Sequence, residues 1–199
     1  MAYHHGNLKY ELIEEGIALV NEGGIANFSL RKLAKRIGVA PTACYNHFLD
    51  KEELLESMTD HINKSLEEAL TKATENAQTS DERYITLAMA KAYVKFFAEN
   101  SRYFFFMYDA GNYVIQLNDN DLVGEYRPFN MFKEVAIRGM KKRGISNEEC
   151  KYNLVAMWAM VHGLATLANT KGFRYDGDWE KLTETILVKK SKVYEQNSL

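Results

Sequence analysis

The sequence predicts an all-α protein of about nine helices, and three observations support this fold class. Proline is scarce, at two, glycine numbers 12 in 199 residues, and strong strand-and-turn punctuation is absent. Apolar residues recur along most of the chain at intervals of three and four, the spacing of one helix face. Residues that suit helix caps stand where several of these segments begin.

The first helix is expected from Leu8 to Asn21, where apolar residues follow helical spacing. Asn7 suits its N-cap, and the pair Gly23-Gly24 suits its end. The next stretch, from Ser29 to Phe48, reads SLRKLAKRIGVAPTACYNHF and predicts two short helices.

Ser29 suits the N-cap of the first short helix, which runs through Ile37. Pro41 suits the first turn of the second, which ends near Phe48.

A tight turn at Gly38 is expected between these two helices. Gly38 adopts a turn conformation that a Cβ would disfavour, and the small Ala34, four residues earlier, lets the helices cross closely. This arrangement is a helix-turn-helix, which places its second helix in the major groove of DNA. Residues 1–50 are therefore expected to form a three-helix DNA-binding domain.

The rest of the chain, residues 51–199, predicts a larger helical bundle for ligand binding and dimerisation. Asp50 and Glu53 form a capping-box pattern at the start of a long helix, and Ser146 and Glu149 form a second. The expected helices span residues 51–74, 82–99, 102–108, 128–144, 146–168 and 179–194. The polar, Asn/Asp-rich stretch 109–124 is expected to be a loop.

Charge is distributed unevenly along the chain. The net charge is −2, so the whole molecule carries no basic signature. From Ser29 to Lys51, however, five basic residues (Arg31, Lys32, Lys35, Arg36, Lys51) stand against one acidic residue, Asp50, giving a local +4. DNA binding requires only such a local patch.

Other classes of protein find little support in the sequence. Cys44 and Cys150 form neither a disulfide framework nor a zinc spacing, which favours a reducing cytoplasm. The N-terminus lacks a signal-peptide profile, and no run of about 18 apolar residues predicts a membrane span. We expect no cofactor and no enzymatic activity, since no P-loop, nucleophile elbow, HExxH or dinucleotide glycine pattern occurs.

With these motifs in place, residues 3–55 resemble the tetracycline-repressor-like (TetR) family of bacterial regulators. The resemblance is carried by LRKLAKRIGVA, then Tyr45-x-His47-Phe48, then Lys51-x-x-Leu54-Leu55. The opening Tyr3-His4-His5-Gly6-Asn7-Leu8 is similar to the start of one subgroup, named for a C-terminal Trp-His-Gly signature. Trp158, His162 and Gly163 match that signature. Cys44 departs from the pattern, since leucine or proline is more usual there.

The resemblance implies that Thr42 and Ala43 approach base edges, while Tyr45, His47 and Lys51 hold phosphates. The full set of expected DNA-binding residues is Ser29, Arg31, Lys32, Pro41, Thr42, Ala43, Tyr45, Asn46, His47 and Lys51. Alternatives remain open: Tyr45 packs the three-helix unit, His47 makes an interhelical hydrogen bond, and the basic residues form a solvated face.

Aromatic residues of the C-terminal region predict a ligand pocket. Its expected lining is Tyr93, Phe97, Phe104, Met107, Met157, Trp158 and His162. The alternative is that these residues only form the core, with His162 a satisfied buried histidine. Gly163 lowers helix stability, and a close helix–helix contact would explain it.

Two short patterns resemble parts of metal sites, but neither has the residues or spacing that a metal site needs. His4 and His5 are adjacent, so they cannot share a helix face, and no Cys or carboxylate cluster accompanies them. Asp119-Asn120-Asp121 fails the spacing of a calcium loop. We expect no metal site.

Together these features predict a cytoplasmic transcriptional regulator, a repressor released from its operator by a largely apolar small molecule. The resemblance implies a homodimer on double-stranded DNA, with the last two helices of each subunit forming its interface. Two alternatives remain open: a small all-α ligand carrier or enzyme, and a protein-binding regulator with a vestigial DNA head.

Overall fold

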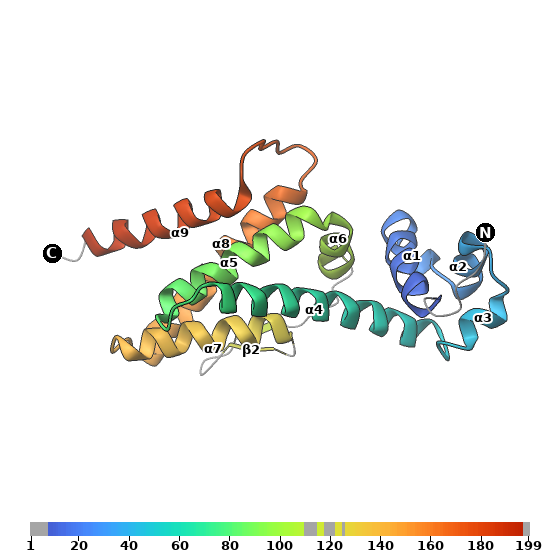
Figure 1. Ribbon diagram of the computed structural model, residues 1–199, viewed down its shortest axis with the longest axis horizontal. Coiled ribbons are helices and arrows are strands. Elements are labelled where there is room, and N and C mark those ends of the chain that lie inside the picture. The colour runs from blue at the N-terminus through green and yellow to red at the C-terminus, as the bar shows by residue number, and fades with distance from the viewer. Residues whose placement is uncertain (1–7, 110–114, 118–121, 125, 197–199) are drawn as a thin grey trace. The chain divides into compact units, whose positions relative to one another are not determined.

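The computed structural model describes residues 8–109, 115–117, 122–124 and 126–196 (Figure 1). Asn7, the pair His4-His5 and the run 119–121 lie outside these residues. The helices are α1 (Leu8–Gly23), the 3-10 helix η1 (Ile25–Asn27), α2 (Leu30–Ile37), α3 (Pro41–Tyr45), α4 (Lys51–Asn76), α5 (Glu82–Glu99), α6 (Ser101–Asp109), α7 (Arg127–Lys142), α8 (Asn147–Asn169) and α9 (Trp179–Gln196). The all-α fold class is confirmed.

The stretch 109–124 differs from the expected loop. It contains two short antiparallel strands, β1 (Ile115–Leu117) and β2 (Leu122–Gly124), with Ile115 paired to Gly124. The apolar and β-branched residues of these two segments favour strand pairing. The polar composition of the whole stretch therefore concealed the two strands.

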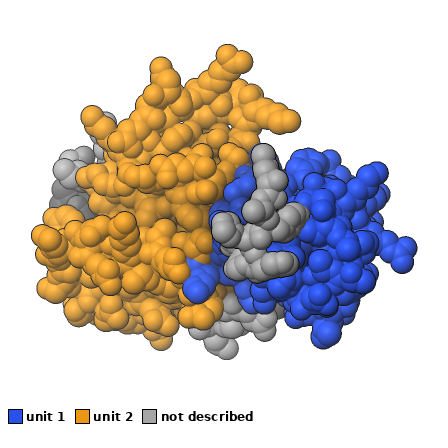
Figure 2. All heavy atoms as spheres, turned by 45° about the vertical axis from the view of Figure 1, so that its right-hand side comes forward, with its two compact units in different colours: residues 1–64, 102–113 blue, residues 65–101, 114–199 orange. Residues whose placement is uncertain are grey.

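The chain divides into two compact units (Figure 2). Unit 1 comprises residues 1–64 and 102–113, and unit 2 comprises residues 65–101 and 114–199. The first part of α4 belongs to unit 1, because its side chains complete the core beneath α1. Met58 is fully buried, and its Cε occupies the space where a Cβ on Gly16 would stand.

The core of unit 1 joins α1, α2, α3 and α4. Its fully or almost fully buried side chains include Leu12, Ile17, Leu33, Cys44, Phe48, Leu54, Met58 and Ile62. The cap at α4 uses local hydrogen bonds, since the Glu53 amide donates to Asp50 Oδ1 at 2.8 Å. The Glu53 carboxylate in turn accepts from the Leu49 amide, one residue earlier than a standard capping box requires.

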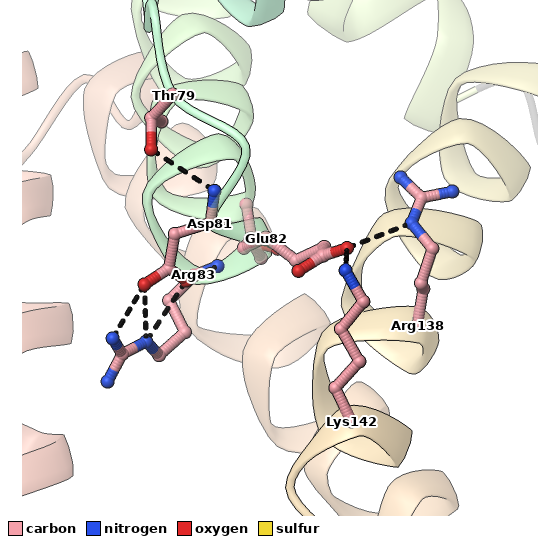
Figure 3. Close-up of polar contacts among 7 residues, drawn as sticks. Thr79, Asp81, Glu82, Arg83, Arg138 and Lys142 are labelled. Atoms are coloured by element: carbon pink, nitrogen blue, oxygen red, sulfur yellow. Dashed lines mark hydrogen bonds and ion pairs between the residues drawn. The ribbon is translucent and has the colours of Figure 1, made fainter.

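Unit 2 is built around α5, which packs against α7, α8 and α9. Gly139 of α7 allows a close crossing, because a Cβ there would lie 2.7 Å from the Glu82 Cβ. Beside this crossing, the buried Glu82 carboxylate accepts from Lys142 Nζ at 2.5 Å and from Arg138 Nε at 3.2 Å (Figure 3). The hydrogen bond from Lys142 is the main reason that the pKa of Glu82 is lowered.

The second expected capping box is confirmed at the start of α8. The Glu149 amide donates to Ser146 Oγ, and the Ser146 amide donates to the Glu149 carboxylate, both at 3.2 Å. Over the residues that the structure describes, no helix is long and apolar enough to cross a membrane.

Candidate nucleic-acid interface and apolar cavity

The turn between α2 and α3 has the geometry that the sequence predicts. Ser29 caps α2 by accepting from the Lys32 amide, and Gly38 ends the helix in the left-handed conformation, with φ of 75°. The Gly38 and Val39 amides both donate to the Ala34 carbonyl, which ends α2 and leaves a short turn before α3 begins at Pro41. Ala34 is fully buried, as a close crossing requires.

One face of α3 is open to solvent. Pro41, Thr42, Tyr45 and Asn46 are exposed, with half of the Tyr45 side chain accessible, whereas Cys44 is fully buried. These four residues follow one another at positions i, i+1, i+4 and i+5, so they share a helix face. Among the residues that the structure describes, no group forms a hydrogen bond with the side chains of Thr42, Tyr45 or Asn46. We call these four residues the reading face.

The other residues expected near DNA at α3 lie beside this face. Ala43 and His47 are partly buried, and the His47 ring lies 6.4 Å from the Phe48 ring, which is buried. The arrangement leaves both a packing role and a phosphate role available to His47.

Some of the basic residues around the reading face make hydrogen bonds within the protein. Arg31 and Lys35 are exposed on α2. Lys32 Nζ donates to the Asn27 carbonyl, and Lys51 Nζ donates to the Ile25 carbonyl, each at 2.7 Å. An ammonium group has three donors, so each lysine retains donors for a phosphate.

Arg36, unlike the other cations of α2, is bonded to two carboxylates of α1. Its guanidinium donates to Glu15 at 2.8 Å and to both oxygens of Glu22 at 2.6 and 2.9 Å. These bonds, chiefly those to Glu22, raise the pKa of Arg36 above its usual range. Arg36 therefore ties α2 to α1 and contributes little free charge to the surface.

The sequence did not single out a buried polar cluster in unit 1, which we call the Glu14 cluster. Glu14 of α1 is 7% exposed, and its Oε1 accepts from the Tyr103 hydroxyl at 2.5 Å and lies 2.7 Å from His61 Nε2. Arg102 pairs with its other oxygen. Burial, followed by the bond to Glu14, raises the pKa of Tyr103.

The Glu14 cluster joins three helices of unit 1, namely α1, α4 and α6. A signal for it exists in the sequence, because Glu14 shares a helix face with the buried Ile17. A carboxylate on a buried face requires partners, but its position does not say which ones.

Unit 2 contains a small apolar cavity. Its volume is about 10 Å³, and it is lined by Leu70, Met89, Ala90, Tyr93, Pro128, Phe132, Trp158 and Val161. This is close to the space that one water molecule needs, and the lining offers no exposed polar surface. The cavity is therefore nearly filled by its own side chains.

Of the residues expected to form a pocket, Tyr93 and Trp158 line this cavity. The Tyr93 hydroxyl lies 3.2 Å from His162 Nδ1, and the His162 ring stacks on Trp158 at a centroid distance of 5.9 Å. Burial lowers the pKa of His162.

The other expected pocket residues lie elsewhere. Phe97 is buried edge-on against Tyr93, Met157 is partly buried on α8, and Phe104 and Met107 are buried in α6 of unit 1. The sequence missed the contribution of α7, although Pro128 and Phe132 stand four residues apart on one face. Within the described ranges, no group of three or more His, Cys, Asp or Glu residues is placed to hold a metal ion.

Comparison with protein families gives two matches. Residues 12–58 match the model of bacterial regulatory proteins of the tetR family, and residues 86–189 match the model of the tetracyclin repressor-like C-terminal domain. Among curated proteins, the HTH-type transcriptional regulator BetI of Yersinia pestis is 32% identical over 83 residues. That alignment covers 42% of this chain and 42% of BetI, less than half of the relative's length.

Solved structures share the fold. The TetR family transcriptional regulator PfmR of Thermus thermophilus has a TM-score of 0.62 at 22% identity, covering 88% of this chain and 93% of PfmR. The transcriptional regulator FadR of Bacillus subtilis, solved in complex with stearoyl-CoA, has a TM-score of 0.65 at 15% identity. That alignment covers 90% of this chain and 95% of FadR.

Proposed function

Because the chain belongs to the tetracycline repressor-like family, we propose that it is a DNA-binding transcriptional regulator, a repressor released from its operator by a small molecule. The observation that carries this proposal is the open reading face of α3, whose side chains face solvent beside exposed cations of α2. The side chains of the reading face are not buried in the core of unit 1, so a DNA groove can reach them. A protein acting on DNA in this way would work in the cytoplasm.

A gel-shift experiment with the DNA that flanks its own gene tests the proposal. The wild-type protein should shift this DNA at concentrations that leave random DNA free. Tyr45→Ala should weaken binding, whereas Tyr84→Ala should not, since Tyr84 is a similarly exposed tyrosine on α5 of unit 2, at 59% against 50%. A protein that shifts no DNA, or two variants that behave alike, would refute the proposed role of the reading face.

We propose a homodimer as the working form. The face of α8 that carries Val155 and Leu167 leaves these side chains more than one-third exposed, and Tyr152 is 57% exposed. Apart from the backbone of its own helix, no described atom lies within 4 Å of a Cβ placed on Gly163, so the close contact expected at this glycine is not made within the described chain. A second copy packed on α8 would supply it, and sedimentation of Leu167→Lys against wild type tests this.

The proposed effector is apolar, because the lining of the cavity in unit 2 is apolar. The cavity of about 10 Å³ holds no such molecule as it stands, so binding requires a state in which the side chains around Trp158 move apart. An effector shifts DNA affinity only through its differential affinity for the two states. The FadR complex suggests stearoyl-CoA as a first probe, with release from DNA as the measurement.

A substitution that enlarges a side chain lining the cavity provides the control variant for this experiment. Ala90 is 3% exposed and lines the cavity, so Ala90→Val should retain DNA binding but lose the response to the probe. The alternative of a ligand carrier finds less support, because this cavity is nearly filled and the open reading face would serve no purpose in a carrier. A protein that binds apolar ligands but no DNA would favour that alternative.

A further inference from the structure

The chemistry of the reading face restricts which base pairs it can recognise. Between Val39 and Phe48 the sequence reads VAPTACYNHF, with no Arg, Lys, Gln, Asp or Glu. The exposed groups are the ring of Pro41, the methyl and hydroxyl of Thr42, the phenol of Tyr45 and the amide of Asn46. The face is therefore neutral and, apart from one amide and two hydroxyls, apolar.

Each base presents a different set of groups in the major groove. Guanine presents two acceptors, N7 and O6, which favour the paired donors of Arg or Lys, and cytosine presents a donor that favours Asp or Glu. Adenine presents one acceptor and one donor, which match the two ends of an Asn amide, and thymine presents a methyl group that favours apolar contact. The reading face holds partners for adenine and thymine but no charged partner for guanine or cytosine.

The Asn46 side-chain amide is available for such a contact. The backbone amide of this residue is used, donating to the Thr42 carbonyl at 3.1 Å, which fixes the position of the residue at the end of α3. Its side chain is exposed, and no group among the described residues binds it. Such an amide has both its donor and its acceptor available for a bidentate contact to adenine.

The nearby cations do not lie on this face. Arg36 is held by Glu15 and Glu22, and Lys51 is bonded to the carbonyl of Ile25. Arg31 is exposed but belongs to α2, the helix that crosses the DNA backbone in a helix-turn-helix. These positions suit contacts to phosphates, which fix the position of the protein without reading sequence.

We propose that the base pairs read by α3 in each half-site are A·T pairs, with thymine methyls against Pro41 and Thr42 and an adenine held through N6 and N7 by Asn46. This inference rests on the proposed function and adds the class of sequence that the operator must contain. It assigns Thr42 and Asn46 as the residues that determine this preference.

Selection of binding sites from a random duplex library tests the inference. The selection is run with wild type, Thr42→Ala, Asn46→Ala and the control Asn76→Ala, whose side chain is exposed at the end of α4. The positions read by α3 are those whose base preference relaxes in the first two variants but not in the control. In wild type these positions should be A·T.

Base analogues then identify the groups that are read. Replacing the critical adenine by 7-deazaadenine removes N7 and should weaken wild-type binding about fivefold or more, with no further effect in Asn46→Ala. Replacing the critical thymine by deoxyuridine removes the methyl group and should weaken wild type more than Thr42→Ala.

The possible failures are distinguishable. A library from which wild type selects no sequence would refute the proposed function itself. Selection of G·C pairs at the positions that relax, or binding indifferent to both analogues, would overturn the inference and leave the regulator intact.

Discussion

Replacing Tyr103 by phenylalanine should destabilise unit 1 by about 2 kcal/mol. The change removes only the hydroxyl, which is buried with a residue 7% exposed and donates to Glu14 at 2.5 Å. A hydrogen bond to a charged group contributes roughly 1.5–3 kcal/mol. Glu14 keeps His61 and Arg102 as partners, and the phenylalanine ring fills the same space, so the lower half of this range applies.

The matched control is Tyr84→Phe. It makes the same chemical change on a side chain that is 59% exposed, where surface substitutions stay within about 0.5 kcal/mol. Urea unfolding followed by far-UV circular dichroism reports both units, since both are helical. Tryptophan fluorescence reports unit 2 alone, because Trp158 and Trp179 are the two tryptophans of the chain and both lie there.

With a slope of about 2 kcal/mol per molar urea, the midpoint seen by circular dichroism should fall by about 1 M for Tyr103→Phe. If the units unfold separately, the fluorescence midpoint stays unchanged, and if they unfold together, both midpoints fall. A difference between the two variants below about 0.5 kcal/mol would show that the Tyr103 bond to Glu14 adds no stability, and the reasoning would be wrong.

Three further changes test other parts of the structure. Lys51→Ala should weaken binding to specific and random DNA alike. It should also make the slope of log affinity against log salt concentration shallower by about one, which is the share of a single phosphate ion pair. An unchanged slope would assign Lys51 to packing alone. Gly139→Ala should lower thermal stability, because its Cβ would lie 2.7 Å from that of Glu82. Gly163→Ala, measured at a protein concentration that keeps the subunit monomeric, should instead raise its stability by up to about 1 kcal/mol, because among the described residues only its chain neighbours and its own helix backbone come within 4 Å of that Cβ. Equal effects of the two changes would contradict the close crossing at Gly139. Because the pKa of His162 is lowered in the folded protein, the unfolded chain takes up a proton more readily, and the stability that neutral His162 contributes is complete above about pH 6.5 and decreases as the pH falls. His162→Asn should therefore flatten the dependence of the melting temperature on pH between about pH 7.5 and 5. Curves for wild type and variant that stay parallel over this range would refute the role of His162.

Features that depend on neighbouring residues could be predicted from the amino-acid sequence. The left-handed turn at Gly38, the cap at Ser29 and the capping box of Ser146 with Glu149 all match the structure. Each involves groups within four or five residues of one another, where chain geometry leaves few alternatives. The same local rules led to a loop where β1 and β2 pair, because pairing depends on a partner strand rather than on the turn between.

The partners of the charged and buried polar groups, by contrast, depend on how the helices pack. Arg36 looked like the other cations of α2, yet it binds carboxylates 14 and 21 residues away. Glu14 meets its partners His61 and Tyr103 at separations of 47 and 89 residues. Such pairs depend on how helices pack, which the spacing of residues along one helix does not contain. The sequence therefore places the reading face of α3, while the packing of α1 against α2 decides which cations remain available beside it.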